Sequence, residues 1–274
     1  MATRSAVINV MAKAAEKAAR GLVRDFGEVE QLQVSRKGPA DFVSTADTNA
    51  EKLLCAELAK ARPDYGFLLE EGGTIEGRDK SNRWIIDPLD GTTNFLHGLP
   101  HWAISIALER EGEIIAGIVY EPLRDEMFWA EKGQGAFNNH QRLRVSARRR
   151  LDEAVLATGI PFKGRGDHPL FLAQLQTLMA ECAGIRRFGS AALDLAYVAA
   201  GRFDAYWETG LKPWDAAAGA LIVVEAGGFV TEIDGGRNPV HGNSILAANG
   251  QLHAPVGKIL REIGKTKPAV ATGA

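Results

Sequence analysis

Apolar residues recur at helical spacing at the start of the chain and predict two helices. Over residues 3–26 they return every three or four positions, as on one face of an amphipathic helix. A second helix is predicted to end at about Ala61, just before a proline, with Thr45 or Asp47 as its N-cap. The segment between them, residues 37–47, holds a Gly-Pro breaker and is predicted to be a loop and turn.

Shorter apolar runs then predict strands. One strand, in the segment "GFLLEE", ends in the acidic pair Glu70-Glu71. Further strands are predicted at residues 83–86, 103–110, 114–121 and 126–130. Glycine and proline mark the turns between them, so this part of the chain is expected to be two helices followed by an antiparallel meander.

After about residue 150 strands and helices alternate. Strands are predicted at residues 154–159, 185–188, 203–208, 229–233 and 244–249. Helices are predicted at residues 170–182, 191–200, 215–226 and 256–263. This alternation is typical of an α/β fold. Because no linker or repeat divides the chain, we expect one domain, 1–274, with an α+β part (1–148), an α/β part (149–267) and a frayed tail (268–274).

The composition restricts the possible classes of partner and location but does not indicate a function. The chain is 46% hydrophobic and 24% charged with a net charge of −2, which gives no general attraction to nucleic acid or membranes. Without a long apolar segment, a cytoplasmic location is expected. Cys55 and Cys182 match no metal or redox motif and are expected to be reduced and largely buried. The basic run Arg148-Arg149-Arg150 predicts a solvated connector, with a patch that binds nucleic acid or a partner as the weaker alternative.

Carboxylates at the ends of apolar runs form the main chemical signal. Asp87 and Asp90 follow one run, Glu70 closes another, and Asp215 begins a helix rich in small residues. Two carboxylates about 4 Å apart repel by about 4 kcal/mol at an effective dielectric of 20, so several together need protons or a cation. With no histidine or cysteine at zinc spacing, a hard cation such as Mg²⁺ fits these oxygen ligands.

Each acid also has an ordinary structural explanation. Asp215 is suited to be an N-cap, and Asp87 and Asp90 are suited to turns. One residue of the pair Glu70-Glu71 is expected to face solvent, because neighbours on a strand point to opposite faces.

The turn after Asp90 is suited to bind an anion rather than a cation. Gly91 permits close backbone approach, and Thr92 and Thr93 supply hydroxyl and amide groups at a predicted helix start, where anions bind. Cation ligands beside an anion site suggest a phosphate bridged by metal ions, and therefore metal-assisted phosphoryl transfer to water.

Two segments resemble known signatures. "DPLDGTTNF" (87–95) and "WDAAAG" (214–219) are similar to the two signatures of the inositol monophosphatase family, and the likeness extends over nearly all of the chain, most of all to the family's bacterial extragenic suppressor type. The resemblance implies the layered α-β-α-β-α sandwich of the inositol monophosphatase and fructose-1,6-bisphosphatase superfamily.

The resemblance also implies a set of metal ligands. Glu70, Asp87 and the Leu89 carbonyl would hold a first Mg²⁺, and Asp87, Asp90 and Asp215 a second, while Glu70 would reach a weaker third ion through water. Many family members have glycine where this chain has Leu69, before the acidic pair; this change is expected to alter the strand end and not the activity.

The resemblance further implies the roles of the remaining site residues. Thr92 and Glu70 would orient and deprotonate the attacking water, next to the catalytic Asp90, and Asp47 would support the metals. The implied substrate-binding residues are Gly91, Thr92, Ala191 and Glu208. His97 and His101 flank the first signature and are expected to be structural or surface residues.

The implied activity is Mg²⁺-dependent, lithium-sensitive hydrolysis of inositol 1-phosphate by a homodimer. Phosphatases of fructose-1,6-bisphosphate, histidinol phosphate or nucleotides are alternatives that share the acidic residues, and Glu208 favours a polyol monoester. A role as a partner of the transcription or RNA-processing machinery is an alternative of another kind.

Overall fold

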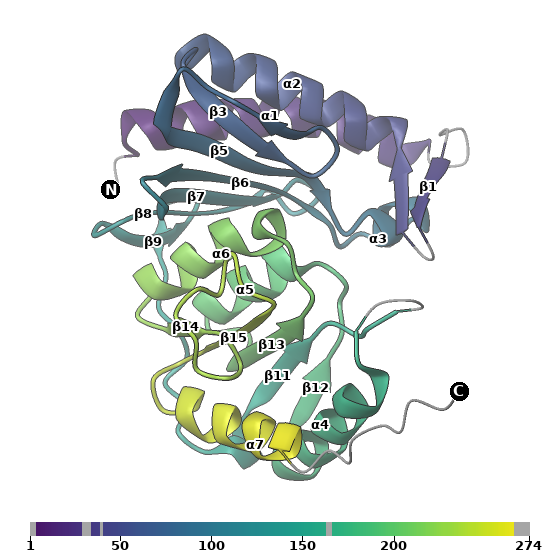
Figure 1. Ribbon diagram of the computed structural model, residues 1–274, viewed down its shortest axis with the longest axis vertical. Helices are drawn as coiled ribbons and strands as arrows, with labels where there is room; N and C mark the ends of the chain where they lie inside the picture. Colours follow the sequence, from purple (N-terminus) through teal and green to yellow (C-terminus); the bar gives the residue numbers. More distant parts are fainter. Residues whose placement is uncertain (1–3, 29–33, 39–40, 163–165, 266–274) are drawn as a thin grey trace.

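Helices and sheets alternate in layers through the molecule (Figure 1). The computed structural model describes residues 4–28, 34–38, 41–162 and 166–265. From one end to the other, the layers are a helix pair, an eight-stranded sheet, a second helix pair, a five-stranded sheet and a third helix pair. The predicted α-β-α-β-α sandwich is therefore confirmed.

The first two layers come from the N-terminal part of the chain. Helices α1 (Ala6–Gly27) and α2 (Thr45–Ala61) cover the outer face of the larger sheet. Its strand order is β10-β9-β8-β7-β6-β5-β3-β4. The strands are β3 (Tyr65–Leu69), β4 (Gly73–Ile75), β5 (Asp79–Asp90), β6 (Ala103–Arg110), β7 (Glu113–Glu121), β8 (Glu126–Glu131), β9 (Gly135–Asn138) and β10 (Gln141–Arg142).

The remaining layers come from the C-terminal part. Helices α5 (Ala191–Ala199) and α6 (Pro213–Glu225) pack between the two sheets, and α4 (His168–Glu181) and α7 (His253–Lys265) pack together at the far end. The smaller sheet has the order β12-β11-β13-β15-β14. Its strands are β11 (Val155–Thr158), β12 (Gly184–Arg186), β13 (Ala205–Thr209), β14 (Phe229–Thr231) and β15 (Ser244–Ala248), after a 3₁₀ turn at Leu151–Glu153.

The side chains of β5 alternate between the two hydrophobic cores, and so the strand packs against the helices on both faces of the larger sheet. Trp84 and Ile86 are fully buried in the core beneath α1 and α2, whereas Ile85 is buried in the core that contains α5 and α6. Successive residues of a strand point to opposite faces, so a strand covered on both sides is apolar throughout. The side chain after Ile86 that faces the inner helices belongs to Asp87.

Several predicted elements differ from those observed. The loop expected at residues 37–47 contains a hairpin of β1 (Val34–Gly38) and β2 (Asp41–Ser44), while Pro39 lies outside the described residues. The N-cap of α2 is Ser44, and Asp47 is the third residue of a capping box, accepting from the Ser44 N–H at 2.9 Å. Likewise Asp215 is not an N-cap, because α6 starts two residues earlier and Lys212 is its cap.

The sheets also depart from the expected pairings. The meander is antiparallel except for β3, which runs parallel to β5, and the smaller sheet is mixed, because β13, β15 and β14 pair antiparallel. Strands β4, β9 and β10 were not predicted, since they are short or glycine-rich. The predicted tail at 268–274 lies outside the described residues. None of the described helices is both long and apolar enough to cross a membrane.

Candidate functional site

Three carboxylates converge where β5 ends and α6 begins. Asp87, Asp90 and Asp215 each place a carboxylate oxygen within 4.8 Å of the others. Asp87 and Asp90 are buried, and Asp215 is half-buried. The start of α6 is held over this face of the sheet by the Ser105 hydroxyl, which donates to the Trp214 carbonyl at 3.1 Å.

A bulge in β5 turns both of its aspartates to the same side. Asp87 pairs with Ser105 and Asp90 with Ala103, so three steps along β5 match two steps along β6. In a regular strand residues three apart point to opposite faces; one inserted residue reverses this. The strand expected to end at Ile86 therefore continues to Asp90, and the Pro88-Leu89 segment supplies the extra residue.

Burial and mutual repulsion raise the pKa values of these groups. Burial is the main cause for Asp87, whose pKa lies well above the ordinary value of 3.8, and the charges of Glu70, Asp90 and Asp215 raise it further. The pKa of Asp90 is raised by burial to about 6, although hydrogen bonds from Ser190 and Ala192 oppose the shift. Burial and then the Asp90 charge raise the pKa of Asp215. A divalent cation would remove the repulsion, and the donor set contains only the oxygen ligands that hard cations prefer.

The fourth acid comes from the strand beside β5. Glu70 follows β3 directly and lines the same cavity as Asp90 and Asp215. Glu71 is not among the residues that line it; its backbone N–H donates to Glu51 Oε2 at 2.9 Å. Leu69, the departure from the family pattern, is 2% exposed and packs in the core, so its side chain points away from the cavity that Glu70 lines.

The turn after the bulge orients a hydroxyl group. Thr92 Oγ1 lies 3.0 Å from Asp47 Oδ1 and 3.0 Å from the Leu89 carbonyl oxygen, so its single proton is directed to one of these acceptors. Gly91 has φ 95°, and a Cβ there would lie 3.1 Å from the His101 carbonyl oxygen. Glycine is therefore required by both the backbone conformation and the space.

Asp47 is held in place by its own turn. Its Oδ2 accepts from the backbone N–H and from the hydroxyl of Ser44, at 2.9 and 2.5 Å, while Oδ1 is left for Thr92. Burial raises the pKa of Asp47, and the Ser44 and Thr92 hydrogen bonds oppose that shift.

A cavity of about 610 Å³ opens beside the acidic cluster. Glu70, Asp90, Gly91, Thr92, Ala191, Glu208 and Asp215 line it. The sequence-predicted residues from five separate segments are thus brought together. Glu208, on β13, accepts the Tyr206 hydroxyl, and burial is the main reason why its pKa is raised to about 7. A Cβ on Gly159 would lie 2.0 Å from the Glu208 carboxylate, so only glycine at position 159 leaves room for that side chain.

Sequence reasoning missed the residues that hold Asp90. Its Oδ2 accepts from the Ser190 hydroxyl at 2.5 Å and from the Ala192 N–H at 2.7 Å, both at the start of α5. Ser190 also caps α5 by accepting from the Leu193 N–H. The serine before a predicted helix was a usable cap signal, but nothing local linked it to an acid 100 residues away.

Other singled-out residues lie away from the cavity. His97 is exposed, and His101 packs between the rings of Phe188 and Tyr197, where burial lowers its pKa to about 4. Arg148 forms an ion pair with Asp204 at 3.3 Å, and Arg150 pairs with Asp152, as expected of a connector.

The two cysteines are unpaired thiols, both half-buried rather than fully buried. They take no part in the acidic cluster or in the cavity lining.

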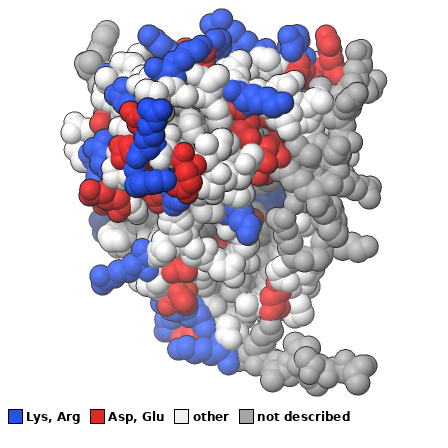
Figure 2. Space-filling model, turned by 45° about the horizontal axis from the view of Figure 1, so that its top comes forward, with Lys and Arg blue, Asp and Glu red and all other residues white. Residues whose placement is uncertain are grey.

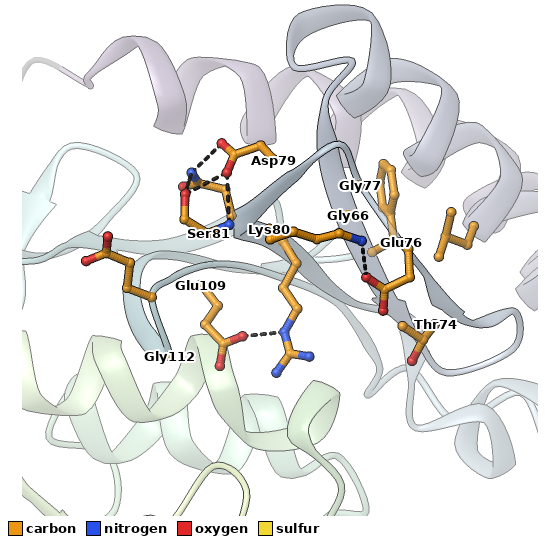
Figure 3. Close-up of a pocket in the computed structure, with 14 residues that line it drawn as sticks. Gly66, Thr74, Glu76, Gly77, Asp79, Lys80, Ser81, Glu109 and Gly112 are labelled. Atoms are coloured by element: carbon orange, nitrogen blue, oxygen red, sulfur yellow. Dashed lines mark hydrogen bonds and ion pairs between the residues drawn. The ribbon is translucent and has the colours of Figure 1, made fainter.

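A second pocket of about 410 Å³ lies near the opposite end of β5 (Figure 3). Its charged side chains are largely matched within the pocket: Lys80 donates to Glu76 at 2.7 Å, and Arg83 pairs with Glu109. Asp79 accepts from Ser81 at its rim. Among the described residues, the cluster of three convergent carboxylates lies at the larger cavity and not at this pocket.

A buried set of oxygen ligands at the wall of a polar cavity defines the class of metal-assisted hydrolases. The model of the inositol monophosphatase family matches residues 3–265. This chain belongs to the inositol monophosphatase family, as its sequence predicted, and that family is metal-dependent.

Individual relatives agree with this assignment. An inositol-1-monophosphatase of Mesorhizobium japonicum is 59% identical over 246 residues, covering 90% of this chain and 92% of the relative. The Nus factor SuhB of Escherichia coli is 45% identical over 243 residues, covering 89% and 91%. The crystal structure of extragenic suppressor protein suhB from Bartonella henselae has a TM-score of 0.92 and 57% identity, covering 94% of this chain and 99% of that one.

Proposed function

We propose that the chain hydrolyses inositol 1-phosphate to inositol and phosphate with two or three Mg²⁺ ions in the acidic cluster. The observation that carries the proposal is the convergence of three carboxylate oxygens within 4.8 Å at the wall of a cavity that also holds Glu208. The 59% identical relative from Mesorhizobium japonicum, an inositol-1-monophosphatase, supports the substrate.

The ligand assignment is the one that the family resemblance implies, and the convergence of Asp87, Asp90 and Asp215 supports it. Glu70, Asp87 and the Leu89 carbonyl would hold one ion, and Asp87, Asp90 and Asp215 the other; Glu70 would reach a third. When bound, the ions would lower the pKa of water and stabilise the leaving alkoxide. The Leu89 N–H donates to Asp87 Oδ1 at 2.9 Å, which fixes that carboxylate beside the carbonyl of the same turn.

Thr92 and Glu70 are proposed to orient the attacking water. Because the Thr92 proton is directed to Asp47 or the Leu89 carbonyl, its lone pairs remain free to accept a hydrogen from water in the cavity. Asp47 acts through Thr92 and is a positioning residue. The attacking water would give up a proton to Glu70 and attack phosphorus in line; the bond from phosphorus to the alcohol oxygen breaks, and that oxygen takes a proton from a second water.

The substrate would lie between the cluster and the smaller sheet. The Gly91 and Thr92 amides are proposed to bind the phosphate, while Ala191 and Glu208 contact the alcohol part. Ala191, on α5, and Glu208, on β13, both line the cavity.

Phosphate release from inositol 1-phosphate tests the proposal. We expect turnover that requires Mg²⁺, stops with EDTA and is inhibited by millimolar Li⁺. Fructose-1,6-bisphosphate, histidinol phosphate and nucleotides serve as competing substrates in the same assay. Failure to release phosphate from inositol 1-phosphate with Mg²⁺ present would disprove the proposed activity.

The Gly159 position offers a test of the substrate wall. In Gly159→Ala the new Cβ would meet the Glu208 carboxylate at 2.0 Å and displace it. We expect KM for inositol 1-phosphate to rise by roughly tenfold or more, with the Mg²⁺ dependence unchanged. Gly21→Ala, on α1 with nothing within 4 Å, is the matched control and should keep the parental KM. Unchanged kinetics in Gly159→Ala would remove Glu208 from the substrate wall.

A second candidate function is binding to the transcription machinery. It rests on the 45% identity to the Nus factor SuhB of Escherichia coli. On the coloured part of the face in Figure 2, Lys and Arg alternate with Asp and Glu, and the net charge is −2. A mixed surface of this kind favours a protein partner over direct binding to nucleic acid. Homodimer formation, implied by the family resemblance, stays a prediction.

A further inference from the structure

An additional carboxyl group lines the substrate cavity on its α5 side. Asp194 is 1% exposed and lines the cavity together with Ala191 and Glu208. Its Oδ1 atom is buried without a hydrogen-bond partner among the described residues. Buried polar oxygens are nearly always paired, and an unpaired one lowers stability.

The local structure gives Asp194 no task of its own. Ser190 caps α5, and the Asp194 N–H donates to the Ser190 carbonyl at 2.9 Å as in any helix. Burial, followed by the charges of Glu208 and Asp90, disfavours the ionised side chain, and only the Arg187 charge opposes them. A residue without a carboxyl group would therefore be more stable at this position. The presence of an acid here is better explained by a ligand in the cavity than by the fold.

The surrounding groups restrict the chemistry of that ligand. Glu208 already accepts the Tyr206 hydroxyl at Oε2, so Glu208 and Asp194 together present carboxyl oxygens from two elements to one space. A second phosphate offers these two carboxyl groups no hydrogen-bond donor. Arg187, which lines the same cavity, repels a cationic amine. A neutral group that carries several hydroxyl donors satisfies both conditions.

We propose that Asp194 accepts a hydrogen bond from a second hydroxyl of the leaving alcohol, so that it and Glu208 select phosphate esters of neutral polyols. This inference rests on the proposed phosphatase activity. It makes Asp194 a specificity-determining residue outside the set of proposed metal ligands, and it disfavours bisphosphates and amino alcohol phosphates such as histidinol phosphate as substrates.

Two Asp194 variants and two substrates test the inference. Inositol 1-phosphate has the hydroxyls, whereas p-nitrophenyl phosphate has none on its leaving group. For Asp194→Leu we expect kcat/KM to fall by about tenfold on inositol 1-phosphate, the loss of one hydrogen bond to a buried carboxyl oxygen, and by less than about twofold on p-nitrophenyl phosphate. Asp194→Asn keeps one acceptor oxygen and should lose less than Asp194→Leu.

Stability and a control complete the design. The Tm of Asp194→Leu should equal or exceed that of the parent, because an unpaired buried oxygen is removed. Asp152→Asn, an exposed acid outside the cavity, should leave both substrates unaffected. Equal losses on the two substrates, or no loss on inositol 1-phosphate, would overturn the role of Asp194 alone. A parent enzyme that hydrolyses only p-nitrophenyl phosphate would overturn the proposed function as well.

Discussion

Asp90→Asn is expected to reduce kcat on inositol 1-phosphate by roughly a thousandfold or more while the protein stays folded. Asparagine keeps the shape of the side chain, and its oxygen would still accept from the Ser190 hydroxyl and the Ala192 N–H. What is lost is one negative ligand of the second metal site. The measurement is steady-state phosphate release at saturating Mg²⁺, with circular dichroism to check the fold.

The controls for this variant separate the two candidate functions. Asp152→Asn, which changes the same chemical group on the surface, should retain full activity. If Asp90→Asn is inactive yet supports growth where the chain is needed for transcription, binding is the dominant role. Substantial phosphatase activity in Asp90→Asn would contradict the ligand assignment.

The protein freed of metal with EDTA is expected to become less stable as the pH rises from 5 to 7.5, and Mg²⁺ to restore stability most at the higher pH. The folded-state pKa of Asp90 is about 6 against an ordinary 3.8. A raised pKa means that the folded protein binds the proton more tightly than the unfolded chain does, so the stabilisation is present below about pH 4 and is lost as the pH passes 6. For Asp90 alone this amounts to roughly 3 kcal/mol of unfolding free energy.

Thermal unfolding with EDTA and with excess Mg²⁺ at the two pH values measures this effect. The Tm difference produced by Mg²⁺ should be several degrees larger at pH 7.5, since at pH 5 the cation must displace bound protons. Asp90→Asn should weaken the pH dependence because it removes one of the titrating groups. A Tm difference that is the same at both pH values would show that the acidic cluster is not the main cation site.

The acidic residues proposed as metal ligands were visible in the sequence because they combine charge with position. Acids after apolar runs, followed by Gly91 and Thr92, are unusual enough to stand out without any contact information. Their orientation was not predictable. Residues three apart on a strand normally diverge, and only the register between β5 and β6 shows that Asp87 and Asp90 share a face.

Other features escaped prediction for related reasons. The cap of α2 is Ser44 because a hairpin strand leads directly into the helix, so the strand end and the helix start share one residue. Asp194 lies in the buried helix α5 and lines a cavity together with Glu208 of strand β13. No local sequence pattern predicts that these two residues lie near each other. Residue type and spacing alone leave Glu70 and Glu71 equivalent; the family resemblance selects Glu70, and Glu70 rather than Glu71 lines the cavity.

The bulge at Pro88-Leu89 makes the length of this segment more important than its composition. Substitutions there alter packing, because Leu89 is fully buried, but they leave the count of residues between the aspartates intact. Deleting one residue would restore the regular two-residue alternation and carry one aspartate to the opposite face of the sheet, among the apolar side chains beneath α1 and α2. The spacing of the two aspartates is therefore a stricter requirement of this site than the identity of the two residues between them.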